Sequence, residues 1–310
     1  MHAAFRMNLA CIVAISAAGC LRSAAQAPTV PICNQDRPEA QSKSDIIDTA
    51  KALISRGATL SVADARKQLK RASCQLSLPE PGTTRLPARE ICAAARRSHL
   101  RVGWSYLCPK CGKWHVNLSG GYWLTADGAA VTCFHVIEPA RDLKQGCLVA
   151  LDEAEQVRPV VEVLAAKQDS DVCIVRVSGE GFTPLALNTN IYPGDTVYCF
   201  SDPAEHQDYF SAGIVNRFYR PAGSRPSKSR AAAAADPTRI NVSTDWAPGS
   251  SGSAILDECG NVIGHVSTIS TFTGGANPKT QPAQAANPTE IVFHEAVSAR
   301  DVLRLIRPPQ

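Results

Sequence analysis

The sequence has no apolar run near its N-terminus that could serve as a permanent membrane anchor. The segment from Leu9 to Ala18 is only about half of the roughly 20 residues that a membrane-spanning helix needs. The sequence also lacks any recognisable nucleic-acid-binding motif, and 32 Lys and Arg are nearly balanced by 28 Asp and Glu. With 45% hydrophobic and 19% charged residues, it is neither disordered nor fibrous. We therefore expect one large or two moderate globular domains and no nucleic-acid partner.

The first 27 residues have the layout of a secretory signal: one early Arg, a short apolar run and then small residues. Two cleavage sites are open. Residues 17–20, Ala-Ala-Gly-Cys, resemble a bacterial lipobox, which would leave a lipidated Cys20 at the new N-terminus. The alternative is cleavage after Ala27, which would leave Pro28 there. Either outcome predicts an exported protein of the bacterial periplasm or cell envelope, and lipidation of Cys20 would attach it to a membrane.

Residues 28–99 form a predicted helical N-terminal region. One helix ends at Gly57, and a second begins after Ser61, which is a favourable N-cap residue. A Pro-rich linker over 78–87 follows, and Pro87 opens a third helix. Lys and Arg outnumber Asp and Glu by 14 to 7 over residues 28–111, which we interpret as a solvated basic helical surface.

From residue 100 onward, helical periodicity is absent until the last few residues. Short apolar runs such as "GCLVALD" and "DVCIVRV" alternate with "ADG", "PGD" and "CGN" turns. This pattern favours an all-β sandwich or barrel and not a βαβ fold. Two segments, 220–238 and 271–289, are predicted loops, and 298–306 is a predicted C-terminal helix.

Three short motifs could together form a hydrolytic site. His135 follows a predicted strand, Asp171 precedes another, and Ser251 lies in the glycine-framed turn "PGSSGSA". Serine hydrolysis needs a hydroxyl, an imidazole that takes its proton and a carboxylate that orients the imidazole. Asp169 and Ser250 are the rival residues, but only Asp171 directly abuts its strand and only Ser251 is followed by glycine.

These motifs resemble those of the trypsin-like (chymotrypsin-fold) serine proteases, and most closely the bacterial HtrA-type branch. The matching stretches are Thr-Cys-Phe-His-Val ending at 136, Asp-Val-Cys-Ile-Val-Arg-Val beginning at 171 and Gly-Ser-Ser-Gly-Ser beginning at 249. Their order agrees with the family, and the resemblance covers about residues 100–307. No PDZ-type module is expected after this domain, because the chain ends soon after the last predicted strand.

The resemblance implies a mainly β fold of two antiparallel barrels with the site in the cleft between them. It assigns Ser251 as nucleophile, His135 as general base and then acid, and Asp171 as the orienting carboxylate. The backbone N–H groups of Gly249 and Ser251 would form the oxyanion hole. Ser253 and Ala254 depart from the Gly-Pro that is common after the nucleophile, which leaves these amide donors in place.

Four residues near Ser251 are candidates for substrate binding. Asp245 lies six residues before Ser251, where trypsin keeps the carboxylate that selects Lys and Arg. A buried carboxylate there would attract a cationic side chain, although Asp245 could equally cap the turn before "APG". By resemblance, three residues of the following strand are expected to line the substrate backbone: Ser267, Thr268 and Ile269.

Ten cysteines follow the predicted signal, a number typical of an oxidising compartment with some disulfides. Several of them, Cys133 and Cys173 among them, are expected to be buried free thiols. Cys108, Cys111 and His115 have a spacing that suits a zinc knuckle, but a structural zinc site wants a fourth ligand. A zinc site, a Cys108–Cys111 disulfide and unpaired thiols all remain open. No cofactor is required for the predicted hydrolysis.

The sequence therefore predicts an exported serine endopeptidase that acts on protein or peptide substrates through an acyl-enzyme intermediate. The alternative is a catalytically silent binding or scaffold protein with the same fold.

Overall fold

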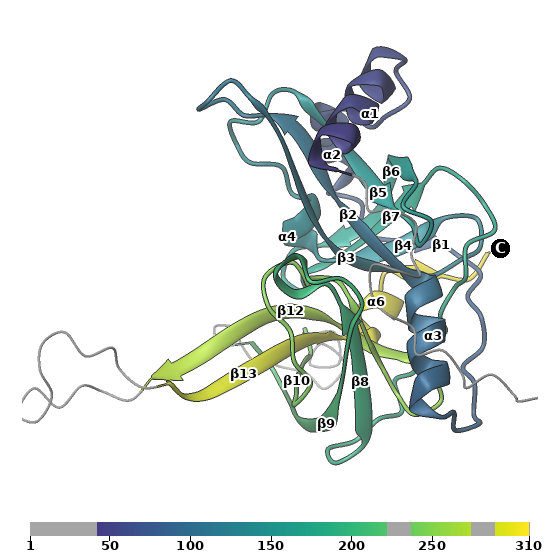
Figure 1. The fold of residues 1–310 in the computed structure, drawn as a ribbon. Helices are drawn as coiled ribbons and strands as arrows, with labels where there is room; N and C mark the ends of the chain where they lie inside the picture. Colours follow the sequence, from purple (N-terminus) through teal and green to yellow (C-terminus); the bar gives the residue numbers. More distant parts are fainter. Residues whose placement is uncertain (1–41, 222–236, 274–288, 310) are drawn as a thin grey trace, which may run out of the picture. The chain divides into compact units, whose positions relative to one another are not determined.

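A computed structural model describes residues 42–221, 237–273 and 289–309. The predicted signal, Cys20 and most of the two predicted loops lie outside the described residues. Within them, the chain forms two closed six-stranded barrels with helices packed around them (Figure 1). None of the described helices is long and apolar enough to cross a membrane.

The first two helices pack on the first barrel. Helix α1 (Lys43–Ser55) begins after a serine N-cap, Ser42, and helix α2 (Val62–Gln68) begins as predicted after Ser61, whose Oγ accepts the N–H of Asp64 at 3.0 Å. The apolar face of α1 lies against β5 (Gly146–Leu151), and the buried residues of this contact are Ile46, Ala50, Leu53, Cys147, Val149 and Leu151. The predicted N-terminal helices are therefore built onto the barrel.

The first barrel has the strand order β2-β3-β4-β7-β6-β5. Its other strands are β2 (His99–Leu107), β3 (Trp114–Trp123), β4 (Ala129–Thr132), β6 (Val157–Lys167) and β7 (Val172–Val177). Neighbouring strands are antiparallel, and β2 closes the barrel by pairing with both β3 and β5. Because one face of each strand points inward, the short apolar runs of the sequence fill the interior.

The second barrel has the order β10-β13-β12-β11-β8-β9 and is closed by the pairing of β9 with β10. Its strands are β8 (Thr196–Ser201), β9 (Tyr209–Tyr219), β10 (Arg239–Val242), β11 (Ala254–Leu256), β12 (Val262–Thr273) and β13 (Thr289–Ser298). Strands β12 and β13 extend out of the barrel as a two-stranded arm (Figure 1). The prediction of two antiparallel β-barrels is confirmed.

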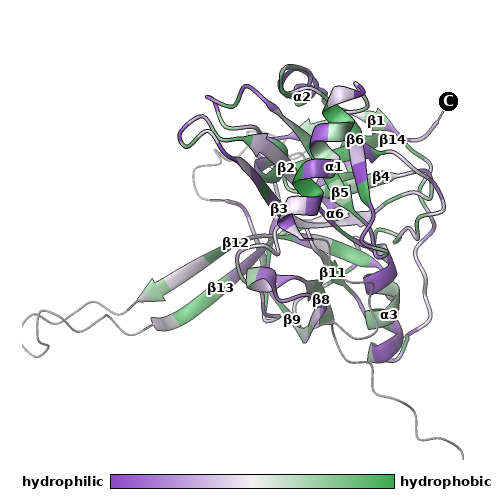
Figure 2. Cartoon of the chain, turned by 45° about the horizontal axis from the view of Figure 1, so that its top comes forward, coloured by the Kyte–Doolittle hydropathy of each residue, from purple (hydrophilic) through white to green (hydrophobic). Residues whose placement is uncertain are grey.

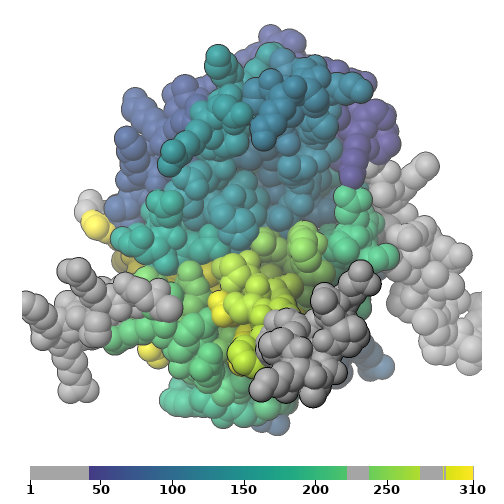
Figure 3. Space-filling view, turned by 90° about the vertical axis from the view of Figure 1, so that its left-hand side faces the viewer, coloured from purple at the N-terminus to yellow at the C-terminus, as the bar shows by residue number. Residues whose placement is uncertain are grey.

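A shared apolar core joins the two barrels. It includes Tyr122 and Ile174 from the first barrel, Phe200 and Val297 from the second, and Ile91 from helix α3 (Ala88–Ser98). Figure 2 shows hydrophilic and hydrophobic residues along α3, as expected for a helix with one buried side. In Figure 3, first-barrel residues in blue and teal adjoin second-barrel residues in green and yellow across one face.

The end of the chain differs from the sequence prediction. The helix expected over 298–306 is shorter: α6 covers Ala299–Leu303, and β14 (Ile306–Arg307) pairs in parallel with β1 (Cys74–Gln75). Local amphipathic periodicity favoured a longer helix. Pairing with β1, more than 200 residues earlier in the chain, draws the last residues into an extended conformation instead.

Candidate active site

His135 and Asp171 lie together at one end of the first barrel. His135 is on the one-turn helix α4 (Phe134–Ile137), just after β4, and Asp171 immediately precedes β7. Strands β4 and β7 are paired through Thr132 and Cys173, so the two motifs are brought side by side. His135 Nδ1 lies 3.0 Å from each carboxylate oxygen of Asp171, and the His135 N–H donates to Oδ1 at 3.1 Å.

The Asp171 carboxylate is largely buried and is held by a third residue. Ser267 Oγ donates to Asp171 Oδ2 at 2.6 Å. Burial alone would raise the pKa of Asp171, but the contacts with His135 and Ser267 outweigh it and hold the pKa well below its usual range. Asp171 is therefore an anion beside the imidazole over the whole range in which His135 could act as a base.

A compact turn brings the serines to the same place. The Ser250 N–H donates to Ala247 O at 3.1 Å, and the Gly252 N–H donates to Val266 O at 2.8 Å. Gly252 has φ +87°, and a Cβ at this position would lie 2.4 Å from Gly120 O and from Thr132 Oγ1. Only glycine fits so close to the end of β4, the strand that leads to His135.

Ser251 is the accessible serine of this turn. Its side chain is part-exposed, and Oγ donates to the carbonyl oxygen of Ser267 at 3.4 Å. Ser250 is fully buried and donates to Ser201 Oγ at 3.1 Å, and Ser253 is also fully buried. Ser267 thus contacts both residues: its carbonyl oxygen accepts the Ser251 hydroxyl, and its own hydroxyl donates to Asp171.

Two backbone donors beside Ser251 are available to a ligand. In the described part of the chain, neither the Gly249 N–H nor the Ser251 N–H has a hydrogen-bond partner. Gly249 has φ +102°, in the left-handed region that favours glycine. Two unpaired amides next to a hydroxyl could stabilise an oxyanion, which is the arrangement predicted for Gly249 and Ser251.

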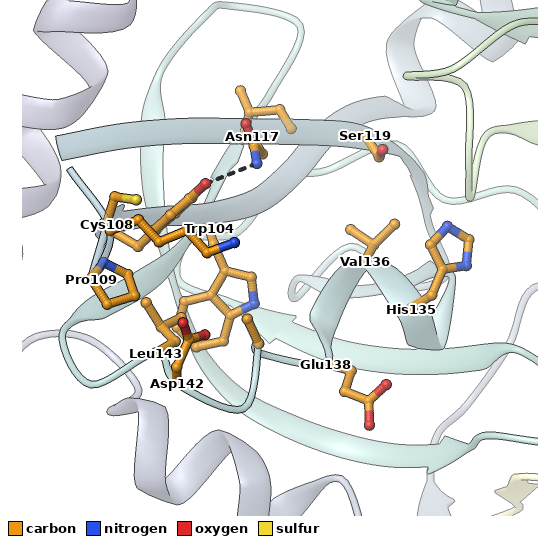
Figure 4. A pocket seen from close by; sticks show the side chains of 14 residues that line it. Trp104, Cys108, Pro109, Asn117, Ser119, His135, Val136, Glu138, Asp142 and Leu143 are labelled. Carbon is orange, nitrogen blue, oxygen red and sulfur yellow. Dashed lines mark hydrogen bonds between the residues drawn. The ribbon is translucent and has the colours of Figure 1, made fainter. Parts of the chain in front are cut away.

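Two cavities adjoin these residues. His135 lines one of about 500 Å³, and Pro248 and Gly249 line another of about 650 Å³. Both are also lined by residues 117–119 of β3. Figure 4 shows the first cavity, with His135 at one end and Cys108 and Pro109 at the other.

The predicted substrate-binding residues have varied surroundings. Asp245 is exposed, so the structure does not bury the carboxylate as a charge-selective pocket would require; its backbone instead pairs with Ser211 Oγ. Thr268 Oγ1 donates to a carboxylate oxygen of Glu295 at 3.0 Å, and Ile269 is exposed. The Ser267 side chain points to Asp171, and this role of its hydroxyl was not predicted.

Cys108, Cys111 and His115 gather where β2 turns into β3. Their sulfur and nitrogen atoms all lie within 4.8 Å of one another. Backbone N–H groups, first that of Cys111 and then that of Lys110, hold the pKa of the Cys108 thiol below its usual value. None of the cysteines within the described ranges is in a disulfide, and Cys133 and Cys173 are buried free thiols as predicted.

The segment that supports the serine turn was not predicted from the sequence. The Ala204 N–H, in the short helix η1 (Pro203–Glu205), donates to Pro248 O at 2.8 Å. The preceding Asp202 lies 3.1 Å from His99 Nε2, and both side chains are buried. Because His99 and Asp202 are 103 positions apart, no local pattern could have paired them.

Comparisons with known proteins agree with the fold. Residues 119–264 match the family described as a trypsin-like peptidase domain. Protease Do-like 1, chloroplastic, of Arabidopsis thaliana is 28% identical over 165 residues, which cover 51% of this chain and 34% of that protein. A probable periplasmic serine endoprotease, DegP-like, of Ectopseudomonas mendocina is 27% identical over 161 residues, covering 51% and 31%. The chain thus spans about a third of the length of these curated relatives.

Among solved structures, the HtrA-type protease AlgW with a decapeptide has a TM-score of 0.50 at 12% identity, over 70% of this chain and 66% of that chain. At this identity the likeness concerns the fold alone. The match of residues 119–264 and the curated relatives go further: this part of the chain matches a trypsin-like peptidase domain, and a Do-like protease and a DegP-like endoprotease are among its relatives.

Proposed function

We propose that this chain is a serine endopeptidase that cleaves protein or peptide substrates with Ser251, His135 and Asp171. One observation carries the proposal. The Ser251 hydroxyl and the Asp171 carboxylate meet at Ser267, beside His135 and beside two unpaired backbone N–H groups. Nucleophile, base, orienting carboxylate and oxyanion donors are the parts that acyl transfer needs.

The geometry supports the following sequence of steps. Asp171 on the Nδ1 side of His135 favours the tautomer in which Nε2 is free to accept a proton. Ser251 Oγ rotates away from Ser267 O, attacks the substrate carbonyl carbon and gives its proton to Nε2. The resulting oxyanion accepts the two N–H groups, and His135 then returns the proton to the leaving amine. Water, activated by the same imidazole, hydrolyses the acyl ester and restores Ser251.

The test is the Ser251→Ala variant, assayed on an unstructured protein substrate. Removal of the nucleophile should lower kcat by at least about 10⁴-fold, because without it the other groups lose their role in acyl transfer. Ser253→Ala is the matched control, since its hydroxyl is buried and has no hydrogen-bond partner among the described residues. Equal hydrolysis by wild type and Ser251→Ala would refute the assignment.

A second function, that of a catalytically silent binding or scaffold protein, has one observation in its favour. The Ser251 hydroxyl donates to Ser267 O, and within the described chain it makes no hydrogen bond to His135. A fluorophosphonate probe distinguishes the two functions, because only an activated serine reacts with it. Labelling of wild type and Ser253→Ala but not of Ser251→Ala would support the peptidase, whereas absence of labelling in all three would support the silent protein.

We also propose that the protein is exported. The arrangement of residues 1–27 supports this, as does the description of one relative as a probable periplasmic endoprotease. The N-terminus of the mature protein, determined by mass spectrometry, should begin at a lipidated Cys20 or at Pro28. Recovery of a chain that still begins at Met1 from the producing cell would contradict export by this signal.

A further inference from the structure

Three metal-ligand side chains converge at the turn between β2 and β3. The Sγ atoms of Cys108 and Cys111 and a ring nitrogen of His115 lie within 4.8 Å of one another, and Cys111 Sγ is 3.1 Å from His115 Nε2. Ligand atoms of a tetrahedral zinc ion stand about 3.5 Å apart, given Zn–S and Zn–N lengths of roughly 2.3 and 2.0 Å. Small side-chain rotations would therefore place all three atoms around one ion.

The backbone already holds the ligands in position. The Cys108 N–H donates to Lys113 O at 2.9 Å, and the Gly112 N–H donates to Cys108 O at 3.0 Å. His115 is fixed by strand pairing opposite Tyr106, and the two rings lie 5.8 Å apart. Because hydrogen bonds and strand register fix the turn, little conformational entropy remains to be lost on metal binding.

The chemistry of the ligands selects the metal. Two thiolates and an imidazole suit a borderline-soft ion such as Zn²⁺ and not Mg²⁺ or Ca²⁺, which take oxygen ligands. Among the described residues, no fourth His, Cys, Asp or Glu joins the cluster. We propose that Cys108, Cys111 and His115 bind one Zn²⁺ ion and leave its fourth coordination position to water or to an external ligand.

The location of this zinc site gives it a consequence for the cavity beside His135. Cys108 and Pro109 line that cavity at the end away from His135 (Figure 4), and Lys110 also lines it. An ion bound to Cys108 would hold this wall of the cavity in one conformation. That consequence rests on the proposed peptidase function, whereas zinc binding itself does not.

Zinc binding is tested on the full chain, reduced and stripped of metal, by titration with Zn²⁺ against a chromophoric chelator. Co²⁺ as a probe adds a visible spectrum that reports thiolate ligation and tetrahedral geometry. Wild type should bind one equivalent. Cys111→Ser and His115→Gln should each weaken binding by more than about 100-fold, which exceeds the loss expected from a supporting contact alone. Cys259→Ser is the control, because it removes a thiol outside the cluster.

Three outcomes would overturn the zinc site. These are less than stoichiometric binding by wild type, unchanged affinity in Cys111→Ser and His115→Gln, or isolation of native protein with a Cys108–Cys111 disulfide and no zinc. Ser251→Ala should bind zinc as wild type does. If the wild-type protein bound zinc but showed no hydrolysis, the proposed peptidase would be contradicted and the zinc site would not. If it hydrolysed substrate but bound no zinc, the zinc site would be contradicted and the peptidase would not.

Discussion

At the scale of single residues, Asp171 has the most constrained position in the candidate site. Its carboxylate contacts the His135 backbone N–H, the His135 ring and the Ser267 hydroxyl. Asp171 also has φ +58°, a conformation that is uncommon for a residue other than glycine. A strained backbone conformation persists where several contacts hold the residue in place, as these three contacts do for Asp171.

Ser267→Ala should weaken this arrangement without removing the carboxylate. A hydrogen bond to a charged group contributes about 1.5–3 kcal/mol, so the free energy of unfolding should fall by about that amount. The pKa of Asp171 should rise, because one of the contacts that lowers it is lost. On the proposed function, kcat should fall about tenfold with little change in KM, and the acid limb of the pH–rate profile should move to higher pH.

Ser270→Ala, on the same strand but with an exposed hydroxyl that donates to Glu295, is the control for Ser267→Ala. Denaturant unfolding and pH–rate profiles measure both variants. If Ser267→Ala matched Ser270→Ala in both measurements, the hydroxyl of Ser267 would not be supporting Asp171.

At the scale of elements, residues 201–204, at the end of β8 and just after it, hold the serine turn in place. Ser201 accepts the hydroxyl of Ser250, and the Ala204 N–H donates to Pro248 O. Asp202 anchors this segment to His99 at the start of β2. Burial acts against ionisation of Asp202, but His99 outweighs it and lowers the pKa of Asp202 to about 2. A buried contact between elements of different barrels, from Asp202 to His99, therefore supports the segment that holds the turn with Gly249.

Asp202→Ala should loosen that support. It leaves the buried His99 ring without its partner, so we expect a loss of about 2–3 kcal/mol in the free energy of unfolding. On the proposed function it should also lower kcat more than it raises KM, because the proposed oxyanion donors would be needed most in the transition state. Asp169→Ala, which removes an exposed carboxylate, is the control. Coincident urea midpoints for the two variants would show that the Asp202–His99 contact contributes nothing.

At the scale of the whole molecule, the two barrels share one core, and a buried histidine lies near their junction. His265 on β12 is fully buried, with Nε2 3.2 Å from the carbonyl oxygen of Asp171 and its ring centroid 6.4 Å from that of Tyr122. Burial lowers the pKa of His265 to about 4. The folded protein therefore keeps this side chain neutral at a pH where the unfolded chain protonates it.

The depressed pKa of His265 predicts a loss of stability in mild acid. Between about pH 6.5 and pH 4 the unfolded state binds the extra proton, so the free energy of unfolding falls as the pH falls through this range. By pH 4.5 the contribution should reach roughly 2 to 3 kcal/mol. Asp171 does not contribute to this loss. Its pKa is lowered, so the stability that it gives the folded protein is lost only at lower pH.

His265→Gln should therefore flatten the dependence of unfolding free energy on pH between 6.5 and 4.5. Urea unfolding at several pH values measures the slope, and His206→Gln, at an exposed position, should leave it as in wild type. A slope that is the same in all three proteins would mean that His265 does not remain neutral in the folded state.

The sequence by itself was sufficient to predict what depends on neighbouring residues. Alternating apolar runs predicted the strands, Ser61 predicted the start of α2, and the motifs around His135 and Asp171 predicted two residues that lie together. The spacing of Cys108, Cys111 and His115 likewise predicted a cluster, because a tight turn brings such residues together.

Tertiary structure decided what depends on residues far apart in the chain. It buries Ser250 and leaves Ser251 part-exposed, exposes Asp245 and turns the hydroxyl of Ser267 toward Asp171. It also draws the last residues into a strand beside β1 and away from the predicted helix. The physical reason is that side-chain direction and burial are set by barrel closure and by packing between barrels. A local pattern of residue types carries no information about either.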